Sequence, residues 1–135
     1  MEPELLQAYE RAHYAVFGEP ELVIRIGELN PDLDDLIEAD GGASAAFITA
    51  ANPFGESQDE WENKLAMIAL SQVLDGKYPS YSGEGRDPKG EWNAEPSLLV
   101  IGITRSEAED LGRRYDQNAI VFIEKGHPPE LVVLA

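Results

Sequence analysis

Two hydrophobic periodicities alternate along this chain, one with the spacing of strands and one with the spacing of helices. The strongest strands are predicted at three apolar runs, residues 45–51, 97–103 and 118–123. In the first run, Phe47 and Thr49 fall on one side and Ile48 falls on the other, which predicts an interior strand covered on both faces. Asn52-Pro53 ends this strand, because proline cannot donate a hydrogen bond to a neighbouring strand.

Weaker alternation predicts four further strands, at residues 14–17, 22–26, 78–82 and 131–134. The first two flank the turn Gly18-Glu19-Pro20, so we expect them to pair as a hairpin. The last strand is expected to pair back after a turn that begins at Gly126 and contains two prolines.

Four helices are predicted from apolar residues at helical spacing: residues 3–12, residues 31–41, residues 57–75, and a helix that starts at 106. Asn30 is expected to cap the second helix. Ser57 with Glu60 and Ser106 with Glu109 have the spacing of capping boxes, which predicts where the third and fourth helices begin.

The third helix is expected to be the main core helix, because more than half of its circumference is apolar. One arc holds Met67, Leu70, Val73 and Leu74, and a second apolar set holds Trp61, Leu65 and Ile68. We interpret Trp61 as a packing residue. Asn63 lies inside the first arc, and a buried amide needs hydrogen-bond partners, which we expect in the Asn52-Pro53 turn.

The predicted order of elements is αββαβαββαββ, with strands joined by short turns and too few helices for a doubly wound sheet. We therefore expect an α+β fold, a two-layer sandwich of a mixed, mostly antiparallel sheet with its helices packed mainly on one face. The length fits a single domain, residues 1–135.

Residues 83–96 are predicted to form a long loop that contains three glycines, two prolines and Trp92. Loops of this length are usually functional or disordered, and Trp92 is expected either to fold back over the core or to contact a ligand or partner. Gly83 and Gly85 superficially resemble a phosphate loop, but no helix follows them, which excludes a nucleotide fingerprint. The loop acids match no EF-hand spacing, and we predict no metal site and no cofactor.

Charge is the unusual feature of the composition, since 26 acidic residues face ten basic ones, for a formal net charge of −16. Such a chain repels phosphate backbones, which excludes nucleic-acid binding. This excess of acidic residues suits a soluble cytoplasmic protein, or else a protein with an acidic surface that mimics DNA or binds a basic partner. The wide spread of the carboxylates favours the first interpretation. We expect no signal peptide and no membrane association.

Several kinds of catalysis are excluded by the residues present. Cysteine is absent, which excludes thiol nucleophiles, thiolate zinc sites and disulfides. Ser97 does not lie in the G-x-S-x-G context of a hydrolase nucleophile. His13 lies at a helix-to-strand junction and His127 in a proline turn, so we assign both structural or surface roles.

Polar residues border the strongest strands. Thr49 and Asn52 close one strand, Ser97 opens another, and Gln117-Asn118 opens a third. If these strand ends converge, they form a pocket suited to binding through amides and hydroxyls, without an obvious general base. The alternative is that each residue only caps a strand or turn.

The same residues carry a resemblance to a bacterial family, domain of unknown function 3293. Three motifs in order are similar to it: FITA at 47–50 with Asn52-Pro53 and Glu62-Asn63; GEG at 83–85 with Trp92, Glu95 and SLLV at 97–100; and QNAIV at 117–121. The resemblance extends over about residues 9–134 and implies family membership, but no activity.

We expect a non-enzymatic binding or interaction domain for a small polar ligand or a protein partner, of open oligomeric state. Its predicted binding residues are Thr49, Asn52, Asn63, Glu84, Arg86, Trp92, Glu95, Ser97, Gln117 and Asn118. One alternative is an enzyme in which Glu84 or Glu95 acts as acid or base near Arg86, with or without Mg²⁺, on a phosphorylated or nucleotide substrate. Another is an acidic DNA mimic or inhibitor.

Overall fold

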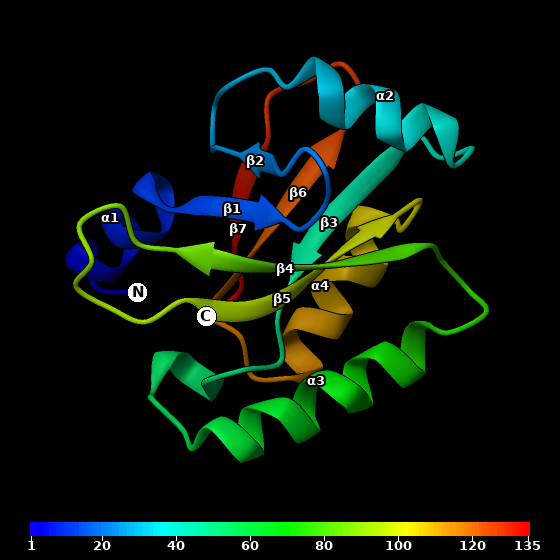
Figure 1. Cartoon of the computed structure of the whole chain (residues 1–135). Helices are drawn as coiled ribbons and strands as arrows, with labels where there is room; N and C mark the ends of the chain where they lie inside the picture. Colours follow the sequence, from blue (N-terminus) through cyan, green and yellow to red (C-terminus); the bar gives the residue numbers. More distant parts are fainter.

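The computed structural model describes all 135 residues, and its helices and strands follow one another in the predicted order (Figure 1). The helices are α1 (Pro3–Arg11), α2 (Pro31–Ala39), α3 (Glu60–Leu74) and α4 (Arg105–Arg114), with a short 3-10 turn, η1, at Pro53–Gly55. The strands are β1 (His13–Val16), β2 (Leu22–Ile24), β3 (Ser44–Ile48), β4 (Ser80–Arg86), β5 (Glu95–Ile101), β6 (Ala119–Glu124) and β7 (Glu130–Val133). No helix has the length and apolar character that crossing a membrane requires.

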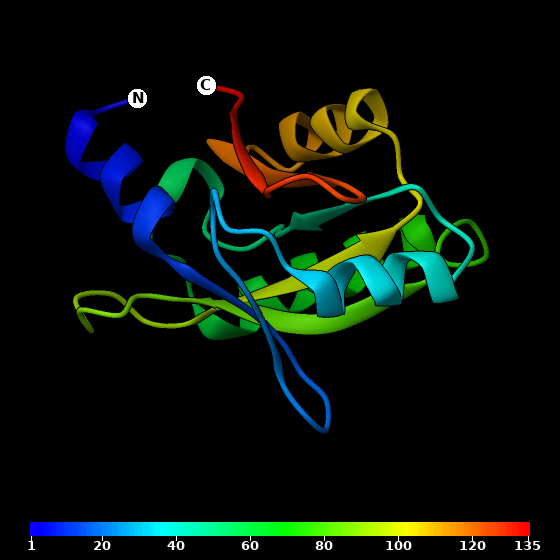
Figure 2. The ribbon, with the colours of Figure 1, turned by 90° about the horizontal axis from the view of Figure 1, so that it is seen from above.

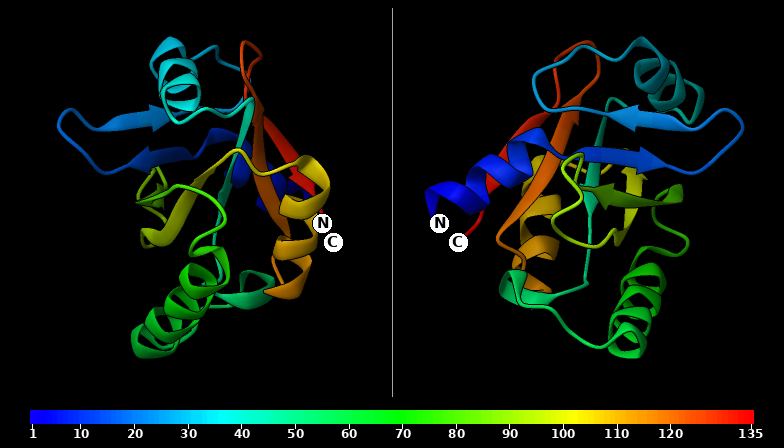
Figure 3. Two further views of the ribbon diagram at one scale, coloured as in Figure 1. Left: turned by 90° about the vertical axis from the view of Figure 1, so that its right-hand side faces the viewer. Right: turned by 60° about the vertical axis from the view of Figure 1, so that its left-hand side comes forward.

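All the strands join one sheet in the order β2-β1-β4-β5-β3-β6-β7, and every neighbouring pair is antiparallel. The α+β class is confirmed, but the expectation of a mixed sheet is wrong. No parallel pair forms because β1–β2, β4–β5 and β6–β7 are hairpins, and β3 inserts antiparallel between the last two. The sheet curls into a half-barrel (Figures 1 and 3), and the Gly27 N–H donates to the Pro129 carbonyl at 2.9 Å, which links the two edges.

Helices cover both faces of the sheet. On one face, the odd-numbered residues of β3, β5 and β6 pack with Leu33 and Ile37 of α2. On the other, the even-numbered residues of the same strands pack with Leu70 of α3 and Ala108 of α4. Figure 2 shows α2 and α4 on opposite sides of the sheet. The expected arrangement with helices mainly on one face is therefore not observed, because an apolar stripe on a helix does not reveal which face of a sheet it covers.

The caps of α3 and α4 differ from those predicted. The Asp59 side chain caps α3 by accepting from the Trp61 N–H at 2.7 Å, so Ser57 lies outside the helix. Thr104 caps α4 by accepting from the Glu107 N–H at 3.2 Å, so the helix begins before Ser106. In α4 two overlapping T/S-x-x-E patterns compete, and the earlier one is used. The Asn30 cap of α2 is confirmed.

Helix α3 contributes less to the core than predicted. Leu70 and Leu74 are buried, but Trp61 is 62% exposed, and Leu65 and Ile68 are also exposed. The interpretation of Trp61 as a packing residue is wrong. Because α3 is apolar on most sides, its sequence pattern does not identify the side that faces the sheet.

Strand β4 is longer than predicted, and it replaces the first part of the expected loop. Residues 83–86 continue the strand, and β5 begins at Glu95, so the loop is residues 87–94. The prediction failed because glycine disfavours strands. Glycine is needed at position 83 for a steric reason, because a Cβ there would overlap the carbonyl oxygen of Ala15 in β1.

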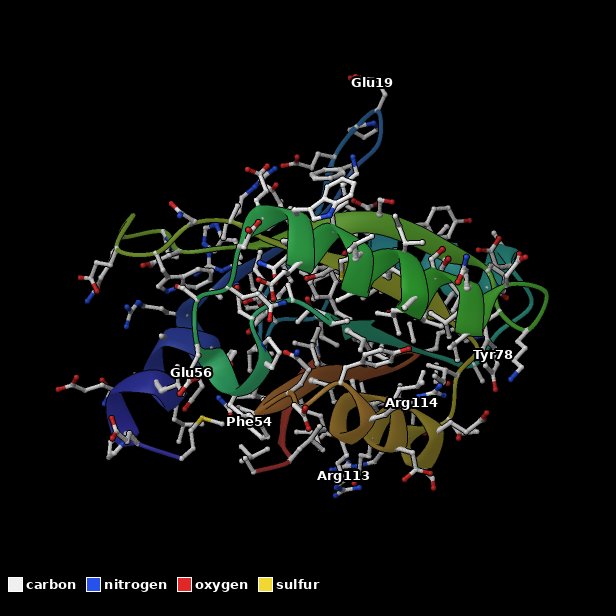
Figure 4. All side chains as sticks on the ribbon, turned by 90° about the horizontal axis from the view of Figure 1, so that it is seen from below. Glu19, Phe54, Glu56, Tyr78, Arg113 and Arg114 are labelled. Atoms are coloured by element: carbon white, nitrogen blue, oxygen red, sulfur yellow. The ribbon has the colours of Figure 1, made fainter.

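Two parts of the molecule extend from its body. The β1–β2 hairpin projects outward, with Glu19 at its tip (Figures 3 and 4). At the opposite side, α1 lies beside both chain termini (Figures 1 and 3).

Candidate functional site

The predicted polar strand ends lie together at one end of the sheet. Strand β3 is antiparallel to both β5 and β6, so its last residues lie beside the first residues of both neighbours. The pairing of Ile48 with Leu98 sets this register. Gln117, just before β6, donates from Nε2 to the carbonyl of Ala51, just after β3, at 3.0 Å. Antiparallel pairing thus brings residues from distant parts of the sequence into one region.

Two connected hollows occupy this region. An inner cavity of about 40 Å³ lies on the face of the sheet that also carries α2, and its lining includes Thr49, Ser97 and Gln117. An open groove of about 1060 Å³ runs over it between α1, the turn after β3, the start of α3 and the 87–94 loop. Trp92 and Glu95 line both hollows, as does Tyr9 of α1, so these three residues mark the junction.

The inner cavity exists because one side chain is missing from a row. Tyr14 of β1 pairs with Gly85 of β4, and Gly85 pairs with Glu95 of β5, so the three residues lie side by side on one face. A Cβ added at Gly85 meets no atom within 4 Å. Glycine at this position therefore leaves an empty space between the Tyr14 ring and the Glu95 carboxylate.

Glu95 is a half-buried carboxylate with one hydrogen bond from the protein. Its Oε2 accepts from Nδ2 of Asn52 at 2.9 Å, and it belongs to no ion pair. Burial raises the pKa of Glu95 above its ordinary value, and the hydrogen bond from Asn52 opposes this shift only in part. A carboxylate in this environment is poised to bind a hydrogen-bond donor or to exchange a proton.

Asn63 fixes the amide of Asn52 that contacts Glu95. Asn63 Oδ1 accepts from the Asn52 N–H at 2.9 Å, and Asn63 Nδ2 donates to Asn52 Oδ1 at 2.8 Å. Gln58 adds two bonds, from its N–H to Asn52 Oδ1 and from Nε2 to Asn63 Oδ1. The predicted pairing of Asn63 with the Asn52-Pro53 turn is confirmed. Asn52 itself adopts a left-handed conformation, with φ of 47°, which this network holds in place.

Three of the predicted binding residues make their hydrogen bonds within the protein. Thr49 Oγ1 donates to the Pro96 carbonyl at 2.6 Å and accepts from the Ala51 N–H at 2.9 Å. Ser97 Oγ donates to the Glu95 carbonyl at 3.1 Å, and Gln117 donates to two backbone carbonyls. These residues cap and join strands, in line with the alternative interpretation, while they also line the cavity.

Aromatic rings form much of the remaining cavity wall. Tyr14 and Phe47 meet edge to face with ring centres 5.3 Å apart, and the Tyr14 hydroxyl donates to the Tyr9 carbonyl. Burial raises the pKa of Tyr9, the nearby charge of Glu95 raises it further, and a hydrogen bond with Asn118 opposes the shift. Trp92 is 36% exposed and covers the cavity from the loop.

The 87–94 loop is held against α1. The Asp87 carboxylate accepts from the N–H groups of Lys89 and Glu91, both at 2.9 Å. Arg11 of α1 lies 3.7 Å from Asp87 and 3.5 Å from Glu91. These contacts position Trp92 over the cavity.

Arg86 and Glu84 do not join this cluster. Arg86 forms a bidentate pair with Glu21 at 2.7 and 2.8 Å and a third bond to Glu84 at 2.7 Å, and it lines neither hollow. Glu84 lines the groove, but it neighbours Gly85 in β4 and points to the opposite face of the sheet from Glu95. Of the two carboxylates expected near Arg86, Glu84 is its partner at 2.7 Å, whereas Glu95 makes no hydrogen bond or ion pair with Arg86. No three acidic or histidine side chains are grouped to hold a metal ion.

Sequence reasoning did not identify Tyr9, Tyr14, Phe47 and Gly85 as site residues. Tyr9 shares an amphipathic helix face with Leu5, but nothing local indicates that α1 covers the strand ends. For Gly85 the signal was its place in the GEG motif of the family resemblance, but the segment was predicted to be a loop, so no position in the sheet could be assigned to it.

A family model described as a protein of unknown function (DUF3293) matches residues 48–120, from the end of β3 to the start of β6. The chain belongs to the DUF3293 family. The match is narrower than the span of about residues 9–134 that the motifs implied, yet it includes Thr49, Asn52, Asn63 and the 87–94 loop. No curated protein and no solved structure matches this DUF3293 chain.

Acidic side chains are spread over the DUF3293 domain. Helix α2 carries Asp32, Asp35 and Glu38 on one side of the sheet, while α3 and α4 carry further acids on the other. The longest basic run, Arg113-Arg114, is exposed on α4, and Arg113 points outward from the molecule (Figure 4). The carboxylates therefore do not form a single band.

Proposed function

We propose that this DUF3293 domain binds a small polar ligand in the groove and inner cavity, with Glu95 and Trp92 as the main contacts. The observation that carries the proposal is the position of the Glu95 carboxylate. It faces a hollow that Gly85 leaves open, it accepts one hydrogen bond, and no basic side chain neutralises it. Buried charges are normally paired, so an unpaired one in a cavity indicates a ligand contact.

The surrounding residues support this role by fixing the geometry. Asn63 and Gln58 hold Asn52, and Asn52 holds one oxygen of Glu95. Trp92 supplies an aromatic surface between cavity and groove. Sites in which supporting residues lock the contacting groups lose less entropy on binding. Within the proposal, the protein works in the cytoplasm, in keeping with the absence of cysteine.

The raised pKa of Glu95 favours a second candidate, an enzyme in which Glu95 acts as general acid or base. The Tyr9 side chain borders the same hollows and lies close enough for the charge of Glu95 to raise its pKa. Under this alternative, the substrate occupies the same space as the ligand. Glu95→Gln would then leave binding within about tenfold but reduce turnover by about 100-fold or more.

Binding of a protein partner is the other function that the sequence allows. The exposed stripe of Trp61, Leu65 and Ile68 on α3 supports a partner surface, since contiguous exposed apolar residues often mark interfaces. The spread of acids over both faces of the sheet gives little support to a DNA mimic, which needs carboxylates in one band.

The test is a thermal-shift panel of metabolites and nucleotides, followed by ¹H–¹⁵N NMR mapping of every hit. A ligand at about 100 times its Kd stabilises a fold by about 2.7 kcal/mol. We expect a hit that shifts the Trp92 indole N–H resonance and that fails to stabilise Gly85→Val, in which the cavity is filled. Trp61→Ser, at an exposed position that lines neither hollow, should respond as the wild type does. Hits that bind Gly85→Val equally well would contradict the proposal.

A further inference from the structure

Glu95 lacks a counter-charge, unlike the neighbouring carboxylates Glu84, Asp87 and Glu91. Two arginines are already engaged with other carboxylates: Arg11 with Asp87 and Glu91, and Arg86 with Glu21 and Glu84. Lys64 is the only basic residue that lines the groove, and its ammonium lies over the Trp61 ring, 5.9 Å from the ring centre. The protein itself therefore supplies no cation to Glu95.

The inner cavity has the composition of a site for an organic cation. Glu95 is its only charged lining residue, and four aromatic residues, Tyr9, Tyr14, Phe47 and Trp92, contribute to its wall. Aromatic faces attract cations through the quadrupole of the ring, most strongly where water is excluded. A carboxylate among aromatic rings combines this attraction with a charge-assisted hydrogen bond.

From this arrangement we infer that the ligand carries an ammonium-type organic cation, which enters the cavity beside Gly85 and donates to the Glu95 carboxylate. The inference rests on the proposed function and names the chemical class of its ligand. The cavity, about 40 Å³, exceeds the roughly 10–15 Å³ that one water needs, so it holds a small head group. The remainder of the ligand lies in the larger groove, against Trp92 and the turn after β3.

Other ligand classes fit the cavity less well. An anion would meet Glu95 and find no basic side chain in the lining. A bare divalent metal ion requires several oxygen ligands, and no group of three acidic or histidine side chains is present. The net charge of −16 also raises the local concentration of cations around the whole molecule. A neutral donor would gain the hydrogen bond but neither the charge pairing nor the interaction with the rings.

The test compares three probes of similar size and different charge: n-propylammonium, 1-propanol and propionate. Each is titrated into the ¹⁵N-labelled protein, and the Trp92 indole N–H and the residues around Gly85 are followed. We expect n-propylammonium to bind at least about tenfold more tightly than 1-propanol, and propionate not to bind. Glu95→Gln should remove this preference. Glu62→Gln changes the net charge equally at an exposed position outside both hollows, and it should retain the preference.

A second readout works in the wild-type protein and does not depend on a variant that folds. Saturating n-propylammonium should lower the apparent pKa of the Glu95 carboxyl, because a bound cation stabilises the charged form.

The outcomes separate the inference from the proposed function. Equal binding of all three probes at the Trp92 resonance would overturn the cation inference and leave the site intact. Cation binding that is the same in Glu95→Gln would show diffuse attraction to an acidic protein and would also overturn it. If neither these probes nor any compound of the larger panel perturbs the cavity residues, both the inference and the proposed function fail.

Discussion

Asn63 is a buried polar residue whose three hydrogen bonds connect α3 to the turn that positions Asn52. It could be predicted from the sequence, because an amide inside an apolar helical arc must find partners nearby. Tyr9 could not, because its role depends on where α1 docks, and no local pattern encodes that position. Residues with local partners are thus more predictable than residues whose partners come from distant elements.

Replacing Asn63 by alanine should destabilise the fold. The Asn52 N–H and the Gln58 amide lose their acceptor, and an unsatisfied buried group costs about 1–3 kcal/mol. Urea unfolding should report this loss of free energy of unfolding. Thermal unfolding should show a fall in Tm of about 4 °C for each kcal/mol lost. Glu62→Ala, at the exposed neighbouring position, serves as control and should change stability by less than about 0.5 kcal/mol. Equal stability of the two variants would show that the network contributes nothing.

The raised pKa of Glu95 predicts a pH-dependent effect of Glu95→Gln. Because the folded-state pKa lies above the unfolded one, this residue stabilises the fold below its unfolded pKa, and the contribution is lost as pH rises through the folded pKa. Gln does not titrate and can still accept from Asn52. The variant should therefore gain stability relative to wild type at pH 7 compared with pH 4, measured by urea unfolding.

The two side chains that act on Glu95 keep the same charge over this range: Asn52 is a neutral amide, and the raised pKa of Tyr9 keeps its phenol neutral at both pH values. Glu62→Gln corrects for the general effect of removing one negative charge. A stability difference independent of pH would mean that the Glu95 pKa is ordinary.

Strand β4 shows how glycine misled prediction at the scale of whole elements. The GEG segment has the composition of a loop, yet it forms a regular strand between β1 and β5. The two positions hold glycine for different structural reasons. At Gly83 the β1 backbone approaches closely, and at Gly85 the missing side chain leaves an open hollow. Neither reason is visible until the strand order is known.

The two glycines make a matched pair of variants. Gly83→Ala should destabilise the protein by about 1–3 kcal/mol, because its Cβ would overlap the Ala15 carbonyl and force the strands apart. Gly85→Ala should be neutral or slightly stabilising, since its Cβ has free space and Ala restricts the unfolded chain. Thermal unfolding of both variants tests whether position 83 is crowded and position 85 is open. Equal destabilisation would mean that no hollow exists at Gly85.

Helix α3 gives a second test at this scale. Trp61→Ser should cost less than about 0.5 kcal/mol, because the side chain is 62% exposed. Leu70→Ala should cost about 2–5 kcal/mol, because Leu70 is fully buried between α3 and the sheet. Urea denaturation measures both. A large cost at Trp61 would show that the outer face of α3 is covered.

At the scale of the molecule, the order of elements and the α+β class follow from the sequence, whereas the strand order and the curl of the sheet do not. Strand order depends on which hairpins meet, and β3 inserts between two of them. The link from Gly27 to Pro129 joins segments separated by most of the chain. The sequence therefore predicted a shared pocket only if the polar strand ends converge, and the strand order is what brings them together.

The net charge of −16 predicts that salt stabilises the fold. Self-repulsion among the acids is screened as the Debye length falls from about 10 Å at 0.1 M to about 3 Å at 1 M salt. We expect Tm to rise by about 2–5 °C over this range, measured by differential scanning calorimetry. A falling Tm would indicate that ion pairs such as Arg86 with Glu21 outweigh the repulsion.

Both proposals depend on Glu95 being a half-buried, unpaired carboxylate beside the hollow at Gly85. The most direct test is a ¹³C NMR titration of the Glu95 side-chain carboxyl in the wild-type protein and in Gly85→Val. We predict a midpoint above the ordinary value of about 4.3 in the wild type, and a higher one in Gly85→Val, where added methyl groups exclude water. An ordinary midpoint that is the same in both proteins would contradict it, because Glu95 would then be a solvated surface residue.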